Sequence, residues 1–193
     1  MNNYKIVLLS GDGIGPEISN VSKRLLSKLS EKYKFNFELK EELFGGIAYE
    51  KKGSPAPQET LENCKSSDAV LLSCVGDEKY DSLSRELRPE TGLLKLRSEL
   101  NLFANIRPVK IRRSLLNASS LRKEIIENVD LIVVRELTGG IYFGEPRGIV
   151  NISGEKKGFN TMTYSASEIK RITDVAIKIT KKRNNKICSV DKA

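Results

Sequence analysis

YKIVLLSGDGIGPEI, residues 4–18, contains a strand, a turn and a helix start in one continuous segment. The apolar run at residues 4–10 predicts a buried strand, and GDGIG, residues 11–15, predicts a tight turn directly after it. Pro16 then favours the first turn of a helix, because its fixed φ angle suits that position. Apolar residues of this helix repeat on one face: Ile18, Val21, Leu25 and Leu29. The segment predicts a βα unit.

Two further strands follow with a helix between them. Residues 35–42, FNFELKEE, alternate as a strand does, and residues 68–75, DAVLLSCV, form a near-continuous apolar run typical of a strand buried on both faces. Residues 57–67 predict a short helix. This alternation of strands and helices indicates a parallel, doubly wound sheet.

The pattern changes after Glu90. Residues 91–100 carry a helical leucine stripe, residues 102–111 are extended because of Pro108, and residues 130–137 predict another buried strand. A capping box of Ser165 and Glu168 starts a long helix. Its apolar face consists of Ile169, Ile172, Val175, Ala176 and Ile179. Residues 186–190 predict a last strand, after which the sequence looks cut short.

Composition excludes several classes of chemistry. The chain has no histidine among its 193 residues, which removes Ser-His-Asp and Cys-His nucleophiles and histidine-bound zinc. Cys64, Cys74 and Cys188 are widely spaced and odd in number, which favours reduced thiols. No apolar run approaches the roughly 20 residues of a membrane span, and the N-terminus has no signal-peptide pattern. We expect a cytoplasmic chain with no membrane contact.

The net charge of +8 comes from 33 basic and 25 acidic residues. These basic residues are scattered and no aromatic-basic repeat accompanies them, so we expect no nucleic-acid partner. A small anionic substrate explains the surplus as well as nucleic acid does, and an ordinary solvated surface explains most of it.

Two possible ligand loops are weak. GDGIG could place backbone N–H groups near a phosphate, but it does not match the known phosphate loops, and Asp12 would repel a pyrophosphate, so a structural turn is at least as good an interpretation. Asp77 and Asp81 could suggest a metal pair, but a convincing third oxygen ligand is missing and Lys79 lies between them. We prefer a solvated loop there.

Three arginines each end or follow an apolar stretch: Arg97, Arg107 and Arg135. A guanidinium group matches a carboxylate with a planar fork of donors, so three that converge would suit a small polycarboxylate. Ordinary surface arginines are the alternative. Tyr142 and Lys192 are candidate proton carriers, although Lys192 would need cationic neighbours, a metal or burial to lower its pKa.

Seven segments occur in one family's order: LLSGDGIGPE, FGG, AVLLSCVG, RPETGLLKLR, LFANIRP, VRELTGGIYFGEPRG and SVDKA. Together they resemble the isocitrate/isopropylmalate dehydrogenase family, and within it the 3-isopropylmalate dehydrogenases. The resemblance implies an α/β fold of the isopropylmalate dehydrogenase type, with a parallel-to-mixed sheet in two domains. It also implies NAD-dependent oxidation and decarboxylation of 3-isopropylmalate to 2-oxo-4-methylpentanoate in leucine biosynthesis, by a homodimer that uses Mg²⁺ or Mn²⁺.

The resemblance also implies residue roles. Arg97, Arg107 and Arg135 are expected to bind the malate part, with Leu93 against the isopropyl group. Tyr142 is expected to protonate the enol, and Lys192 to act as base in the partner's site. The expected cofactor contacts form one loop that ends near the nicotinamide ribose: Gly76, Asp77, Glu78, Lys79, Tyr80, Asp81, Ser82, Leu83, Ser84, Arg85, Glu86, Leu87, Arg88, Pro89 and Glu90.

Some features depart from the family. Ser10 stands where many members have proline, and VGDEKYD replaces a more usual glycine-proline-tryptophan loop. The family continues past SVDKA with metal-binding aspartates and an adenosine-binding loop, so no metal ligand is expected in this chain. We expect an incomplete cofactor-side domain over residues 1–101, an incomplete substrate and dimer domain over residues 102–193, and no activity from these 193 residues alone.

Two alternatives stay open at the level of sequence. One is a sibling β-decarboxylating dehydrogenase that acts on isocitrate, homoisocitrate or tartrate. The other is an inactive truncated remnant that acts as a binding module for an anionic partner.

Overall fold

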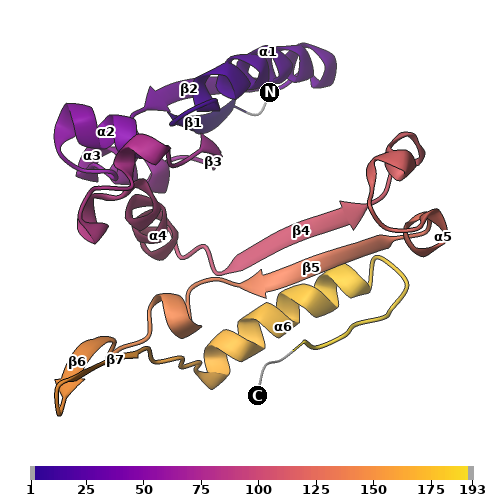
Figure 1. Ribbon diagram of the computed structural model, residues 1–193. Coiled ribbons are helices and arrows are strands. Elements are labelled where there is room, and N and C mark those ends of the chain that lie inside the picture. Colours follow the sequence, from indigo (N-terminus) through magenta and orange to yellow (C-terminus); the bar gives the residue numbers. More distant parts are fainter. Residues whose placement is uncertain (1–2, 191–193) are drawn as a thin grey trace. The chain divides into compact units, whose positions relative to one another are not determined.

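The computed structural model describes residues 3–190 and divides into two compact units, one that ends at Asn101 and one that begins at Leu102. Among the described residues, the first unit contains one sheet and the second contains two (Figure 1). The α/β class expected from the sequence is confirmed, and the sheets include both parallel and antiparallel pairs.

The first unit is built on a parallel sheet with β1 (Asn3–Gly11) in the middle. Strand β2 (Asn36–Glu42) pairs with one side of β1 and β3 (Ala69–Cys74) with the other. Four α-helices belong to this unit: α1 (Gly15–Tyr33), α2 (Gly46–Lys52), α3 (Gln58–Lys65) and α4 (Pro89–Glu99). Two short 3₁₀ turns, Glu78–Tyr80 and Arg85–Leu87, lie in the loop before α4. The parallel arrangement predicted from the alternation of elements is confirmed.

The core of the first unit lies between the sheet and helices α3 and α4. Its fully buried apolar members include Val7 and Leu9 of β1, Leu61 of α3 and Leu96 of α4. Burying each such side chain stabilises the fold by about 1.5–3 kcal/mol. Strand β3 is less buried than its apolar sequence predicted, because most of its residues are only half-buried.

The apolar face of α1 is largely exposed. The helix forms where expected, but Ile18, Val21 and Leu25 are 42%, 64% and 58% exposed. The buried residues of α1 are the small residues Gly15 and Ser19. The Ser19 hydroxyl lies 2.8 Å from that of Ser73 in β3. The apolar periodicity located the helix but not the face that the described residues cover.

The second unit contains an antiparallel ribbon of β4 (Ala104–Lys110) and β5 (Asp130–Glu136), with α6 (Ala166–Thr180) alongside β5 (Figure 1). A 3₁₀ helix, Arg113–Ala118, and α5 (Lys123–Ile126) connect the two strands. Strand β5 was predicted to be buried, but it is covered on alternate residues only. The capping box of α6 is confirmed, since Ser165 Oγ accepts from the Glu168 N–H and Glu168 Oε2 accepts from the Ser165 N–H.

The second unit also contains a hairpin that the sequence analysis missed. Strands β6 (Gly148–Ile152) and β7 (Glu155–Phe159) are joined by Ser153 and Gly154, whose φ angles are 54° and 85°. Two central residues with positive φ define the turn that suits a two-residue hairpin, and the Ser-Gly dipeptide itself was the available signal. The strand predicted at residues 186–190 is wrong, because this segment pairs with no strand among the described residues.

Candidate functional site

Arg135 and Tyr142 are in contact at the end of β5. Arg135 lies near the end of the strand, and Tyr142 lies in the 3₁₀ turn Gly140–Tyr142 that follows it. The Arg135 Nη2 donates a hydrogen bond of 2.8 Å to the Tyr142 hydroxyl, and the guanidinium carbon lies 5.5 Å from the centroid of the ring. Both side chains are exposed, so the pair is open to a ligand.

Arg107 lies on the same face of the ribbon as Arg135. Asn105 is directly opposite Arg135 and Arg107 is opposite Val133, so the two arginines are diagonal neighbours across an antiparallel pair. Asn105 Oδ1 accepts a 2.7 Å hydrogen bond from Arg107 Nε, which orients that guanidinium group. The ribbon therefore presents two cations on one face.

Helix α6 covers the other face of the ribbon. Ile132, Val134 and Glu136 are half-buried while their neighbours along β5 are exposed. Glu136 Oε1 accepts from Arg171 Nη2 of α6 at 3.0 Å. Ile132, Val134 and Glu136 thus face α6, and Arg135 is on the opposite face of the strand.

Glycines shape the turn between Arg135 and Tyr142. The Glu136 carboxylate accepts from the backbone N–H groups of Thr138 and Gly139, at 2.9 and 2.8 Å. Gly140 has a φ angle of 69°, and a Cβ atom there would lie only 2.3 Å from the Tyr164 hydroxyl oxygen. A side chain at Gly140 would be strained by this positive φ angle, and the Tyr164 side chain would have to move.

Arg147 supports this turn and was not singled out by the sequence analysis. Its Nη1 donates a 2.9 Å hydrogen bond to the backbone carbonyl of Tyr142, and its Nε lies 3.1 Å from Glu145 Oε1. The available signal was the pair of opposite charges in EPRG, directly after the aromatic residues.

The other predicted substrate residues, Leu93 and Arg97, lie in the first unit, where Leu94 is their neighbour. Leu93, Leu94 and Arg97 are half-buried residues of α4, and Arg97 is one helical turn beyond Leu93 on the same side of the helix. The convergence of Arg97 with Arg107 and Arg135 stays a prediction, because the two units are described separately. Lys192 lies outside the described residues.

The predicted cofactor loop has a buried support and an exposed surface. Tyr80 and Pro89 are buried, and Gly76, Asp77, Leu83 and Leu87 are half-buried. The exposed side chains are those of Glu78, Lys79, Asp81, Ser82, Ser84, Arg85, Glu86, Arg88 and Glu90. Those exposed side chains are the ones that a bound molecule could reach without rearrangement of the loop.

Charged neighbours hold the first part of this loop on α2. Glu50 Oε1 accepts a 3.0 Å hydrogen bond from the Tyr80 hydroxyl and lies 2.9 Å from Lys79 Nζ. The hydrogen bond from Lys79 lowers the pKa of Glu50 and, in return, raises the pKa of Lys79. Burial raises the pKa of Tyr80. Glu50 and Lys79 are therefore a charged pair at neutral pH.

The turn GDGIG is structural. The Asp12 N–H donates to the Cys74 carbonyl and the Gly15 N–H to the Asp12 carbonyl, both at 2.9 Å. The Asp12 side chain is buried and accepts hydrogen bonds from backbone N–H groups of the same unit. The phosphate-loop interpretation therefore gives way to the structural one. Asp77 Oδ1 accepts from the Lys79 N–H, as expected of a solvated loop.

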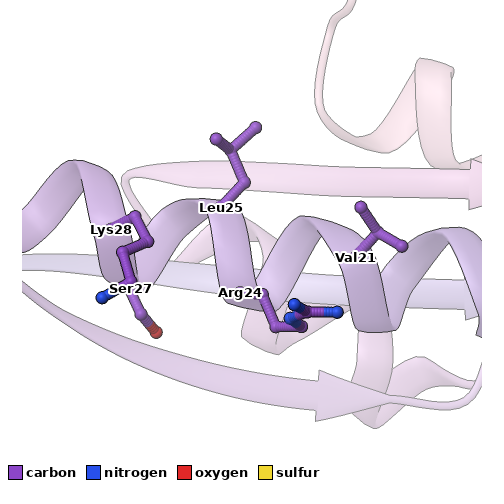
Figure 2. Close-up of a pocket in the computed structure, with 5 residues that line it drawn as sticks. All are labelled: Val21, Arg24, Leu25, Ser27 and Lys28. Atoms are coloured by element: carbon purple, nitrogen blue, oxygen red, sulfur yellow. The ribbon is translucent and has the colours of Figure 1, made fainter.

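Helix α1 lines a pocket in the first unit. Figure 2 shows Val21 and Leu25 projecting from one side of the helix, with Arg24, Ser27 and Lys28 beside them. None of the predicted substrate or cofactor residues lines it. The pocket coincides with the exposed apolar face of α1.

Metal ligands are not grouped in the described part of the chain, and the Cys64 thiol is buried. Across residues 3–190, no three acidic or cysteine side chains are grouped so that they could hold a metal ion. Burial raises the pKa of the Cys64 thiol to about 11, so this cysteine is unreactive at neutral pH. Within the same residues, no helix has the length and apolar character that a membrane crossing requires.

Comparison with known proteins identifies the relationship. Over all of its length, the chain is 72% identical to a 3-isopropylmalate dehydrogenase from Prochlorococcus marinus (strain MIT 9312), of which it covers 54%. The chain thus spans about half the length of the curated relatives that it matches.

Two solved structures share the fold. A β-decarboxylating dehydrogenase from Thermococcus kodakarensis superposes with a TM-score of 0.65 at 25% identity, over 94% of this chain and 46% of that one. An isocitrate dehydrogenase from Methylococcus capsulatus gives the same TM-score and identity, over 93% of this chain and 48% of that one. The model of the family described as isocitrate/isopropylmalate dehydrogenase matches residues 5–193. The chain therefore belongs to the isocitrate/isopropylmalate dehydrogenase family.

Proposed function

We propose that a full-length protein containing this chain, of the size of its relatives, is an NAD-dependent 3-isopropylmalate dehydrogenase. It oxidises and decarboxylates 3-isopropylmalate to 2-oxo-4-methylpentanoate in leucine biosynthesis. The observation that carries the proposal is the 72% identity, along the whole chain, to a relative of that name. Isocitrate dehydrogenase is the weaker candidate, because the similarity to the solved isocitrate dehydrogenase is only 25%.

The side chains of α4 favour an apolar substituent on the malate. Leu93 and Leu94 occupy the helix that also carries Arg97. An isopropyl group buried against leucine contributes about 2 kcal/mol to binding, whereas the third carboxylate of isocitrate would be left unpaired there. Apolar residues at these positions therefore select for isopropylmalate by rejecting charge.

The proposed reaction starts with the substrate held by its carboxylates. Arg107 and Arg135 share one face of the ribbon, where they can bind the two carboxylates of a malate with Arg97. Bound NAD would supply the acceptor for the hydride of C2. Lys192 of one subunit of a homodimer is proposed to act in the site of the other subunit, where it takes the proton of the C2 hydroxyl.

Tyr142 completes the proposed reaction. After CO₂ leaves C3, the Tyr142 hydroxyl gives its proton to that carbon. The contact with Arg135 supports this role, because the hydroxyl oxygen accepts from Arg135 and its own proton is free to point elsewhere. The resulting enzyme is proposed to be a cytoplasmic homodimer.

The described residues fit only part of the expected cofactors. The exposed Glu90 carboxylate, in the first turn of α4, is suited to accept hydrogen bonds from the nicotinamide ribose. Residues 3–190 offer no group of ligands for Mg²⁺ or Mn²⁺.

The direct test is an assay of the full-length protein with NAD and each of three substrates: 3-isopropylmalate, isocitrate and tartrate. We expect NADH formation with 3-isopropylmalate, at a kcat/KM about 100-fold or more above the other two, as a buried unpaired carboxylate implies. A preference for isocitrate or tartrate would show that the substrate is wrong. No NADH with any of them would show that the reaction is wrong.

A further inference from the structure

Tyr80 is the point at which the loop of residues 76–90 is anchored to α2. It is only 5% exposed, although Glu78, Lys79, Asp81 and Ser82 around it are exposed. Its ring lies against the start of α2, since a Cβ atom on Gly46 would come within 1.8 Å of Tyr80 Cε2. Gly46 is therefore required for the ring to lie where it does.

The hydroxyl of Tyr80 makes a second contact with the same helix. It donates to Glu50 Oε1 at 3.0 Å, and Lys79 Nζ lies 2.9 Å from that oxygen. Lys79 Nζ also lies 4.8 Å from the centroid of the Tyr80 ring. One carboxylate on α2 thus holds two consecutive residues of the loop.

Asp12 joins the beginning of the loop to the beginning of α2. Asp12 is only 4% exposed. Oδ2 accepts from the backbone N–H groups of Gly46 and Gly76, and Oδ1 from that of Ile47, each at 2.9 Å. Since a carboxylate has only acceptor oxygens, it can satisfy all three donors, which an amide cannot do.

The two ends of the loop lie beside each other at Gly76. A Cβ atom on Gly76 would be 2.8 Å from Glu90 Oε1, so the Glu90 carboxylate lies close to the Cα atom of Gly76. Between these ends, Arg88 donates to the Asp81 and Leu83 carbonyls, at 2.7 and 3.0 Å. The loop is therefore closed on itself and tied to α2 at Gly76 and at Tyr80.

We propose that Asp12 and Tyr80 are positioning residues for NAD binding: they hold residues 76–90 against α2, so that Glu90 and the exposed side chains of the loop are already ordered when the cofactor arrives. This inference rests on the proposed function. When the loop is already ordered before NAD binds, the entropy cost of ordering it does not reduce the binding affinity. Loss of an anchor therefore weakens cofactor affinity and leaves the chemical step intact.

The test is Tyr80→Phe in the full-length protein, with Tyr33→Phe as the matched control, because Tyr33 is an exposed residue at the end of α1. Tyr80→Phe keeps the ring on Gly46 and removes the bond to Glu50. We expect the KM and the Kd for NAD to rise about fivefold, with kcat and the KM for 3-isopropylmalate unchanged. Tyr33→Phe is expected to match the wild type.

Asp12→Asn is the second variant. The amide must turn a donor toward at least one backbone N–H group, so a larger rise in the Kd for NAD is expected, of about tenfold or more. Hydrogen exchange of residues 77–88 should accelerate in both variants and stay unchanged in Tyr33→Phe.

Each outcome decides a different point. If the wild type is active and Tyr80→Phe binds NAD with the wild-type affinity, the positioning role is overturned and the proposed function stays intact. An equal loss of kcat and of affinity for both ligands would also overturn it, since that pattern indicates general destabilisation. A wild type that neither binds nor reduces NAD overturns the proposed function, and the positioning role with it.

Discussion

The Arg135 guanidinium group donates its hydrogen bond to the oxygen of Tyr142, across 2.8 Å, and therefore leaves the phenolic proton of Tyr142 uncommitted. The cation also lies 5.5 Å from the centre of the ring, which fixes the position of the phenol relative to the strand. A tyrosine held in this way can give its proton to a ligand bound beside Arg135.

Tyr142→Phe should reduce kcat in the full-length protein by about 100-fold or more, because general acid catalysis contributes that much. The KM for NAD should stay at the wild-type value, since the phenol is expected to act on the substrate. Steady-state kinetics would measure both constants. A kcat equal to that of the wild type would contradict the acid role of Tyr142.

Arg107→Ala should raise the KM for 3-isopropylmalate by about 10- to 100-fold, because a charge-assisted hydrogen bond contributes about 1.5–3 kcal/mol. Arg135→Ala should raise the KM and also lower kcat, since this variant loses the contact with Tyr142 as well. Arg112→Ala is the matched control, because Arg112 is exposed beyond the end of β4. Wild-type kinetics in both site variants would rule out the arginine site on the ribbon.

Gly154→Ala should destabilise the β6–β7 hairpin by about 1 kcal/mol, because φ at this position is 85° and a Cβ atom is costly there. Gly158→Ala is a matched control. A Cβ atom meets no other atom within 4 Å at either glycine, and Gly158 is outside the positive-φ set. Hydrogen exchange of the hairpin amides in both variants would measure the difference. Equal protection in the two variants would show that the turn does not need a left-handed residue.

The capping box of α6 should make helix stability depend on pH. Hydrogen bonds from the Ser165 backbone and side chain lower the pKa of Glu168 below its usual 4.5. Its stabilising effect is therefore complete above the unfolded-state pKa and is lost as the pH falls through the lower folded-state value. In Glu168→Gln, which keeps the capping hydrogen bonds without titrating, this part of the pH dependence should vanish.

Circular dichroism during thermal unfolding, at several values between about pH 6 and about pH 3, would check this prediction. The wild type should lose more helix stability on acidification than Glu168→Gln does. Parallel curves for the two proteins would show that Glu168 does not contribute as a charged cap.

Local signals in the sequence were sufficient for some features and insufficient for others. The α6 cap was predictable because Ser165 and Glu168 are three residues apart and act within one turn. The contact between Arg135 and Tyr142 is also local, within a segment of seven residues, but the sequence analysis did not predict it. The hairpin at residues 148–159 had a usable signal in Ser153 and Gly154 that was overlooked.

Other features depend on residues that are distant in the sequence. The bond from the Gly76 N–H to Asp12 spans 64 residues, and neither sequence neighbourhood indicates it. The apolar stripe of α1 indicated the helix, but periodicity does not say what covers its apolar face. Residues 186–190 have the composition of a strand and lack a partner strand among the described residues, so composition alone was misleading.

Successive side chains of β5 alternate between the two faces of the strand. Val134 and Glu136 lie under α6, and Arg135 lies on the exposed face. Substitutions beneath the helix can therefore alter stability while the arginine keeps its place, and the reverse also holds. A deletion of a single residue within the strand would exchange the two sets, bringing a cation under the helix and valine to the surface. Evolution can change the identity of these residues far more easily than it can change their number.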